Sequence, residues 1–485
     1  MYRHKRICFE ETGVPYSREH VVRVIDGWVF NRPPSDLTGA DERLARFQRK
    51  AATFPGGYYI KVIRPEVVDL VDGLRKHPRP AAPLPELLAH LEEAIDAHGR
   101  IMGDLHWRMV FSGTPLDWPT IFHELTGEPA ERAGILLSGT ANEVTKLTRR
   151  LRALASLAAD DDELLAAVSS ADLSELRGHP DQPLFQKFWT SFRTLLRHYG
   201  LRTGQGWGSA VTMGAPTWNM RPDVPLGMIA AYATADQETL THREKTASHE
   251  RQRLLQRIQR GLRSDPERLQ RFETARQQAI RNALTMEDHN HWMDSSAAGV
   301  MREAADVVGR RLVSDGKLDD PYDVLHMALD ELRDQDDVRD EVRARRERFK
   351  QQEAFDPPRT IGSGAVEKGE SMEAEGQGLD GALLRGVCAS AGRYKGRARV
   401  VVRSFEPPDV SDGDVLVCID SGPSWTPIFP LLGAIVLDRG ATWQHAAVIA
   451  REFGIPAVFG TQEATTAIKD GQTITVDGDA GIVEL

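Results

Sequence analysis

The sequence contains few cysteines and has no long apolar segment. Its three cysteines, Cys8, Cys388 and Cys418, form no CxxC spacing, which excludes a disulfide framework or a cysteine-rich zinc module and indicates thiols kept reduced in a cytoplasm. No run of about 18 apolar residues is present. The charged N-terminal stretch MYRHKRICFEETGVPY is followed by no apolar segment. We therefore expect no membrane span, no signal peptide and a cytoplasmic location.

A basic excess is also missing. Lys and Arg number 61 against 71 Asp and Glu, which gives a formal net charge of -10 over 485 residues. Binding to nucleic acid or to an anionic membrane needs a concentrated basic face. We therefore expect neither as a partner, and the length allows two or more domains.

The chain divides at a stretch rich in Gly, Pro, Glu and Ser. Residues 353–380 contain almost no large apolar side chains and have no helical or strand period, as is typical of a flexible linker. Before it, residues 1–352 show mainly helical periodicity, for example in LPELLAHLEEAIDAHGRIM and FQKFWTSFRTLLRHYG. The sequence therefore predicts a mainly helical domain followed by a linker.

Residues 381–485 have a different pattern. Five short β-branched runs, separated by Gly, Pro and Asp turns, predict strands: RARVVVRSF, DVLVCID, GAIVLD, PAVFG and TITVDG. One helix interrupts them near His445, with a buried stripe through Ile449 and Phe453, with Arg451 and Glu452 facing outward, and with a glycine stop at Gly454. The fold class predicted is multidomain α+β with a small β/β/α C-terminal domain.

His445 is predicted at the N-terminus of that helix. Unpaired backbone N–H groups and the helix dipole favour negative charge there. An imidazole that carries a phosphoryl group is therefore stabilised more at this position than an unmodified imidazole. Gly440 allows close backbone approach, and the Thr442 hydroxyl can bind the same oxygens. A histidine that only fills the start of the helix is the alternative.

Residues 384–485 resemble the swivelling phosphohistidine domain of phosphoenolpyruvate-utilising enzymes. The resemblance lies in LRGVCASAGRYKGRARVVV and in GATWQHAAVIAREFGIPAVFGT, which is similar to the family signature around its phosphorylated histidine. It implies that His445 is the phosphohistidine, with Gly440, Thr442 and Gln444 around the phosphate. Gln444 and Ala441 depart from the usual residues, which implies a reshaped phosphate pocket.

Residues from about 100 to 345 resemble the substrate-binding region of rifampin-phosphotransferase-like proteins. Within them, MEDHNHWMD places Glu287 and Asp288 four and three residues before His291, so that on a helix a carboxylate can orient the imidazole as a general base. His289 is a second candidate, and Trp292 is a candidate for an aromatic substrate pocket. A solvated helix face with incidental histidines is the alternative.

Two further site expectations follow from the helical part. Arg202 in YGLRTGQGWG is a candidate for binding the transferring phosphoryl group, with a structural ion pair as the alternative. The histidines of the first part share no metal-ligand spacing; these are His77, His90, His98, His106 and His123. We expect no metal and no cofactor to be bound by this chain.

The resemblance implies a split enzyme. In the family an ATP-grasp domain usually accompanies the histidine domain; we expect none within the helical first part, and we expect no phosphoenolpyruvate barrel after Leu485. A separate ATP-grasp subunit, with ATP and Mg²⁺, is then expected to phosphorylate His445, and the group passes to a hydroxyl, as in phenylphosphate synthases. The products expected are AMP, phosphate and a phenolic phosphate ester. The alternatives are a rifamycin-type acceptor, a phosphohistidine carrier or regulator without a small acceptor, and an inactive interaction module.

Overall fold

The computed structural model describes most of the chain. The described residues are 21–25, 28–32, 42, 45–46, 49, 57–76, 78–112, 117–179, 181–203, 215–334, 338–353, 378–402, 410–421, 425–442 and 444–485. The linker predicted at residues 353–380 therefore lies almost wholly outside the described residues. The boundaries at 352 and 381 stay a prediction.

The chain forms two compact units, which we describe separately. The first takes residues 1–114, 211–216 and 292–369, and the second takes residues 115–210, 217–291 and 370–485. The second unit therefore combines helices from residues 115–291 with the C-terminal sheet.

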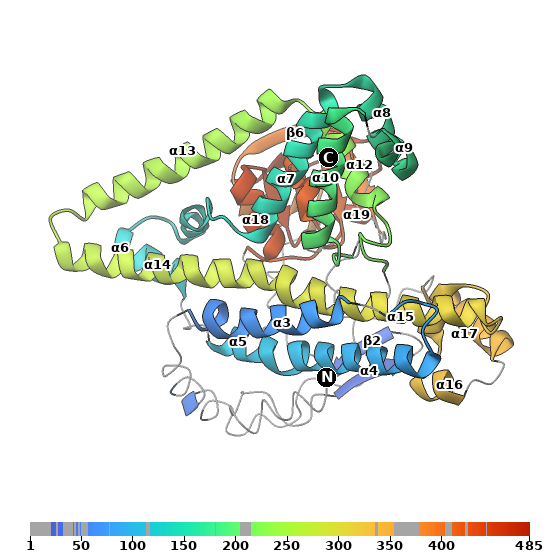
Figure 1. The fold of residues 1–485 in the computed structure, drawn as a ribbon. Coiled ribbons are helices and arrows are strands. Elements are labelled where there is room, and N and C mark those ends of the chain that lie inside the picture. The colour runs from blue at the N-terminus through green and yellow to red at the C-terminus, as the bar shows by residue number, and fades with distance from the viewer. Residues whose placement is uncertain are drawn as a thin grey trace. The chain divides into compact units, whose positions relative to one another are not determined.

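The first unit is mainly helical. Within it, α15 packs along α4 and against η5 (Figure 1). Its described elements are β1 (Val21–Ile25), β2 (Trp28–Arg32), η1 (Tyr59–Ile63), α3 (Arg64–Leu74), α4 (Leu84–Arg100), η2 (Ile101–Leu105), α5 (His106–Ser112), α15 (Ser296–Ser314), η5 (Pro321–His326), α16 (Leu329–Asp334) and α17 (Arg339–Glu353).

Several helices of the second unit begin at side chains that cap them. Asn142, Asp236 and Asp265 each accept a hydrogen bond from a backbone N–H of the first turn, which satisfies donors that a helix leaves unpaired. The described helices that precede the C-terminal sheet in this unit are α6 (Trp118–Thr126), η3 (Ala130–Leu137), α7 (Glu143–Ala159), α8 (Asp162–Ser169), α9 (Leu173–Gly178), α10 (Pro183–Tyr199), α12 (Asp223–Thr234), α13 (Gln237–Gly261) and α14 (Pro266–His289). A π-helical segment, η4 (Asn290–Ser295), follows α14 directly.

The C-terminal sheet confirms all five predicted strands. Its order is β3-β4-β11-β10-β6-β7-β8-β9-β5, and β6 to β9 pair in parallel. The elements are β3 (Gly378–Asp380), β4 (Leu383–Arg385), β5 (Val387–Ser390), β6 (Arg393–Val401), β7 (Val415–Cys418), η6 (Thr426–Leu431), β8 (Ala434–Leu437), α18 (His445–Phe453), β9 (Ala457–Phe459), α19 (Ala464–Ala467), β10 (Thr473–Asp477) and β11 (Ile482–Glu484). The predicted fold class is confirmed.

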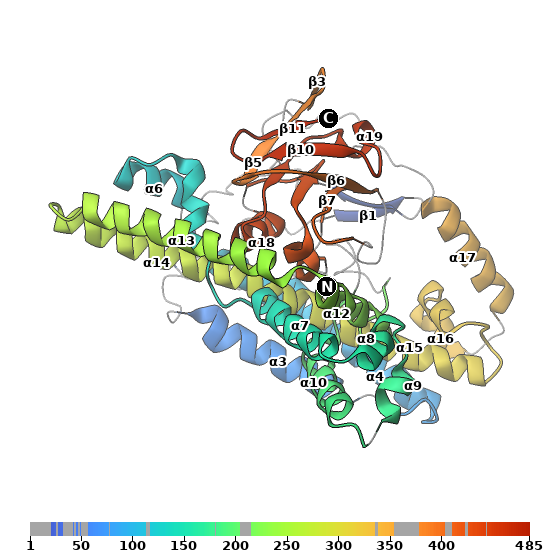
Figure 2. The same ribbon diagram turned by 90° about the horizontal axis from the view of Figure 1, so that it is seen from above.

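Both faces of this sheet are buried, because alternate residues of a strand point to opposite sides. Leu416 and Cys418 of β7 face a core that includes α18, η6 and side chains of α7, α10 and α12. Val415 and Val417 face a second core that includes α19. Figure 2 shows α18 and α19 on either side of the strands. The first core joins the helix that carries His445 to the helical part of the same unit.

Candidate functional site

His445 is the first residue of α18, where the sequence predicted it. The helix ends at Gly454, whose φ of +66° gives the expected left-handed cap. In the preceding loop Gly440 has a φ of +146°, and a Cβ atom there would lie 2.8 Å from Gln444 Oε1. A side chain at this position is therefore strained, and Gln444, the N-cap residue, is held close to the loop that carries Thr442.

The two ring nitrogens of His445 face different partners. Nδ1 forms an ion pair with Glu287 Oε2 at the end of α14, and Nε2 lies 3.4 Å from Thr426 Oγ1 of η6. Both side chains of the ion pair are largely buried, His445 at 13% and Glu287 at 5% exposure. A carboxylate on Nδ1 fixes the orientation of the ring and directs Nε2 to act as the nucleophile.

The prediction that Arg451 and Glu452 face outward is wrong. Arg451 Nη1 donates to the carbonyl oxygens of Ala389 (2.6 Å) and Thr442 (2.8 Å). Burial lowers the pKa of Arg451 to about 10, and the negative charge of Glu287 opposes this shift. Helical periodicity identified the apolar stripe, but it could not show that a long side chain beside the stripe reaches back to the loop. Arg451 thereby fixes the loop that precedes His445.

Glu452 fixes the other side of α18 to the helical part. Its Oε2 accepts a hydrogen bond of 2.6 Å from the backbone N–H of Gly139. Burial raises the pKa of Glu452 to about 7, although that hydrogen bond and the charges of Arg251 and Arg149 favour the ionised form. The group therefore titrates close to neutral pH.

The Glu452→Gln variant should be more stable than the wild type at alkaline pH. A carboxyl group whose pKa rises from 4.5 to about 7 on folding stabilises below pH 4.5 and loses that contribution as pH rises through 7. Glutamine keeps an acceptor for Gly139 without the buried charge. We expect the variant to match the wild type at pH 4 and to gain about 3 kcal/mol at pH 8. Urea unfolding at both pH values measures this, and a gain that is equal at both contradicts it.

The predicted site residues that follow Glu287 lie against different partners. Asp288 Oδ1 accepts a 2.9 Å hydrogen bond from the Glu143 N–H at the start of α7. His291 lies beside the ring of Tyr199, with 4.9 Å between centroids. Asp288 thus positions α7, whereas Glu287 contacts His445.

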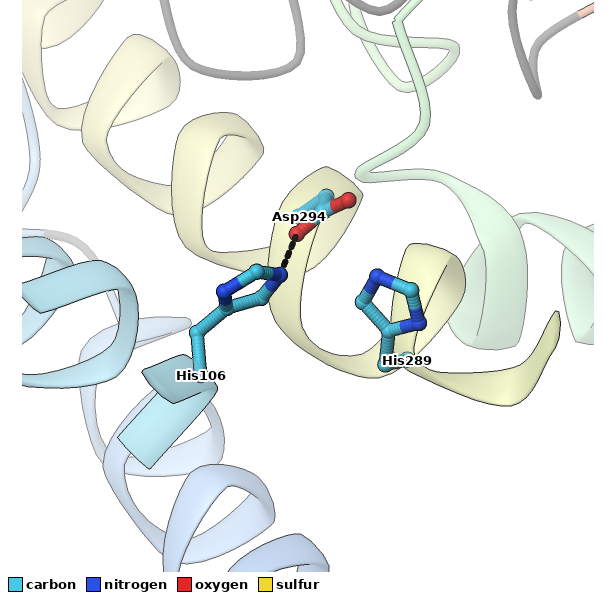
Figure 3. Close-up of side chains that lie close together, drawn as sticks. All are labelled: His106, His289 and Asp294. Atoms are coloured by element: carbon cyan, nitrogen blue, oxygen red, sulfur yellow. Dashed lines mark ion pairs between the residues drawn. The ribbon is translucent and has the colours of Figure 1, made fainter. Parts of the chain in front are cut away.

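The remaining predicted residues of the segment are buried or belong to the first unit. His289 is 5% exposed. The Trp292 ring packs against Arg64, whose guanidinium carbon lies 5.6 Å from the centroid of the ring. In the same unit His106 Nε2 lies 4.0 Å from Asp294 Oδ1 (Figure 3). The contact with Arg64 gives Trp292 a packing partner, and its role in substrate binding stays a prediction.

Arg202 is buried, with 1% exposure, and its guanidinium lies 5.7 Å from the Trp218 ring centroid. Burial lowers its pKa to about 10, while the charges of Tyr199 and Glu143 favour the cation. These surroundings favour the structural alternative for Arg202. Its role in binding a phosphoryl group stays a prediction.

The sequence analysis missed a second polar cluster in this unit, centred on Glu143. Its Oε2 accepts a hydrogen bond from Tyr199 Oη at 3.1 Å and lies 3.3 Å from His198 Nε2, and Oε1 binds Lys146 Nζ at 2.7 Å. Burial alone would raise the pKa of Glu143, but the hydrogen bonds from His198 and Lys146 outweigh it and hold the pKa below its usual range. The only local signal was the cap residue Asn142 before Glu143.

One group of possible metal ligands lies within this unit and is buried or half-buried. Ligand atoms of Glu143, His198 and His291 all lie within 4.8 Å of one another. In the described part of the chain, no helix is both long enough and apolar enough to cross a membrane.

Two segments of the chain match known protein families. Residues 410–481 match the family described as "PEP-utilising enzyme, mobile domain", and residues 109–287 match "Rifampicin phosphotransferase fourth domain". His445 lies in the first match, and Glu287 is the last residue of the second. The ion pair therefore joins the two matched segments.

Similar curated proteins cover different parts of the chain. Rifampicin phosphotransferase of Streptomyces sp is 30% identical over 83% of this chain and 47% of that protein. Phosphoenolpyruvate synthase of Aeropyrum pernix is 42% identical over 26% of this chain and 16% of that protein. Chondramide synthase cmdD of Chondromyces crocatus is 26% identical over 98% of this chain and 13% of that protein. This chain thus spans less than half the length of these relatives.

Proposed function

The chain belongs to the phosphoenolpyruvate-utilising enzyme family, and from this we propose that it is a phosphotransferase that carries a phosphoryl group on His445 and delivers it to a hydroxyl group. The observation that carries the proposal is the placement of His445. It lies at the N-terminus of α18 with its Nδ1 against the buried carboxylate of Glu287. That arrangement leaves Nε2 directed as a nucleophile beside a site that favours anions.

The first transfer forms an N–P bond at Nε2. The P–O bond of the donor breaks, and the proton on Nδ1 stays shared with Glu287, which offsets the positive charge that develops on the ring. The unpaired N–H groups of the first turn of α18 and the Thr442 hydroxyl are available to the phosphoryl oxygens. Positioning and electrostatics are the main contributions of a protein to such a step.

The second transfer breaks that N–P bond. The acceptor oxygen attacks phosphorus, a base takes the hydroxyl proton, and Nε2 regains its lone pair. If ATP is the donor in a dikinase-type reaction, ATP, water and the acceptor yield AMP, phosphate and the phosphate ester. We assign ATP and Mg²⁺ to a separate ATP-grasp component; the two matched segments are described as a mobile domain and as the fourth domain of rifampicin phosphotransferase.

We propose a small phenol as the acceptor. The pKa of a phenol is about 10, so a histidine or carboxylate base can remove its proton in the transition state. A rifamycin-type hydroxyl is the second candidate, because the matched domain and several relatives are named for rifampicin phosphotransferase.

Acceptor-dependent AMP release tests the function. The full chain is combined with an ATP-grasp protein encoded beside it, ATP, Mg²⁺ and a panel of phenols, aliphatic alcohols and a rifamycin. We expect AMP and a phosphate ester to form together with a phenol. If an ester forms only with the rifamycin, the acceptor is a rifamycin-type hydroxyl and not a phenol. Labelling of the chain without any ester would favour a phosphohistidine carrier. Absence of labelling with an active ATP-grasp protein would contradict the proposed function.

A further inference from the structure

Three side chains from separate elements of the second unit converge beside the phosphotransfer site. Glu143 is the first residue of α7, His198 lies near the end of α10, and His291 lies in η4. One ligand atom of each lies within 4.8 Å of the other two. We propose that this Glu143 cluster (Glu143, His198 and His291) binds one divalent transition-metal ion of the zinc type.

The distances within the cluster suit a single small ion. His198 Nε2 and Glu143 Oε2 are 3.3 Å apart, and two ligands bound about 2.0–2.1 Å from a tetrahedral zinc ion lie about 3.3 Å apart. The His198 and His291 ring centroids are 5.3 Å apart, so both imidazoles can reach the same ion. Two imidazoles with one carboxylate form a ligand set that zinc, cobalt and iron(II) accept.

Surrounding hydrogen bonds hold the carboxylate in a position suited to a ligand. Asn142 caps α7 through the Thr145 N–H, and Asp288 accepts from the Glu143 N–H, so the backbone of Glu143 is fixed from two sides. Lys146 binds Oε1, and Tyr199 donates to Oε2. Hydrogen bonds of this kind orient ligating carboxylates in metal sites.

A carboxylate that is buried away from water favours a bound cation as its partner. The Glu143 side chain is 4% exposed, and His291 is 2% exposed, whereas Lys146 is 42% exposed and shares its charge with solvent. Buried Arg202 supplies one positive charge close by, and Asp288 supplies a second carboxylate. The carboxylates of Glu143 and Asp288 match the two charges of a divalent ion on neutral imidazoles, and the charge of Arg202 remains in excess.

Three protein ligands leave the fourth tetrahedral position open, as in catalytic zinc sites. An acceptor hydroxyl bound there would lose its proton more readily, because a metal ion lowers the pKa of a bound hydroxyl. This role, though not the binding itself, rests on the proposed function. Asp288 contacts Glu143 while its neighbour Glu287 contacts His445, so α14 links the two sites.

Metal binding is measured on the full chain without ATP or acceptor. After treatment with a chelator, the protein is titrated with Zn²⁺ and with Co²⁺, and bound metal and the cobalt absorption bands are followed. We expect one ion per chain, with a tetrahedral cobalt spectrum. The His291→Ala and Glu143→Gln variants should bind at least about 100-fold more weakly, more than the loss that removal of a supporting hydrogen bond causes.

His179→Ala is the matched control, because it removes one histidine from the only other group of metal ligands found within the described residues of the second unit, Glu163, Glu175 and His179. It should bind metal like the wild type. Loss of binding in this control with retention in Glu143→Gln would overturn the proposal, as would no stoichiometric binding by a folded wild type. Labelling of His445 is assayed separately, so failure of the proposed function stays distinguishable from failure of the metal site.

Discussion

Replacement of His445 by alanine should abolish phosphorylation of the chain and ester formation together. In the proposed mechanism the imidazole is the only group of the protein that forms a covalent bond to phosphorus, and removal of a nucleophile typically costs at least about 10⁴-fold in rate. Transfer of radioactive phosphate from labelled ATP, in the presence of the ATP-grasp component, measures the first step. Release of AMP and of the ester measures the sum of both steps.

A second histidine variant separates loss of chemistry from loss of fold. His249 is exposed on α13, and His249→Ala should label and turn over like the wild type. The His445→Ala variant should still fold but unfold at a lower temperature than the wild type, because it leaves the buried carboxylate of Glu287 without its partner. Acid-labile labelling that persists in a folded His445→Ala protein would show that another residue carries the phosphoryl group.

The second large effect is expected for Glu287→Gln. The amide keeps the size of the side chain but cannot hold Nδ1 in its protonated form as a carboxylate does, nor stabilise the ring when it becomes positively charged. Loss of an equivalent carboxylate beside a catalytic histidine costs up to about 10⁴-fold in other enzymes. We expect the rate of His445 labelling to fall by about 10²- to 10⁴-fold, measured by rapid quench.

The carboxylate of Glu287 acts on the reaction through His445, so the test needs a readout beyond the loss of rate. The Glu287→Asp variant should recover part of the lost labelling rate, because it restores a carboxylate that can face the ring, which a purely space-filling role would not predict. Glu267→Gln provides the control, since Glu267 lies on the same helix but is exposed. Wild-type labelling by a folded Glu287→Gln protein would show that the ion pair has no part in the chemistry.

The sequence alone predicted most of the secondary structure and the position of His445. Alternating β-branched runs predicted β6 to β10, and the apolar stripe with Gly454 predicted α18, since both patterns are periodic and local. The resemblance to a family added the phosphohistidine at His445. Glu287 was selected only as one of several candidates in MEDHNHWMD, because a helical spacing cannot say which partner each side chain meets.

The tertiary structure decided which side chains share a site. Glu287 meets His445, and Glu143 meets His198 and His291, across long separations in the chain that no periodic pattern encodes. The π-helical segment after α14 adds to this, because it changes the spacing on which the predicted pairing of Asp288 with His291 depended. The direction of Arg451 was likewise set by the carbonyls of a loop and not by its position on the helix. The local pattern thus determined the helix that presents His445, and packing between distant segments determined the charges around it.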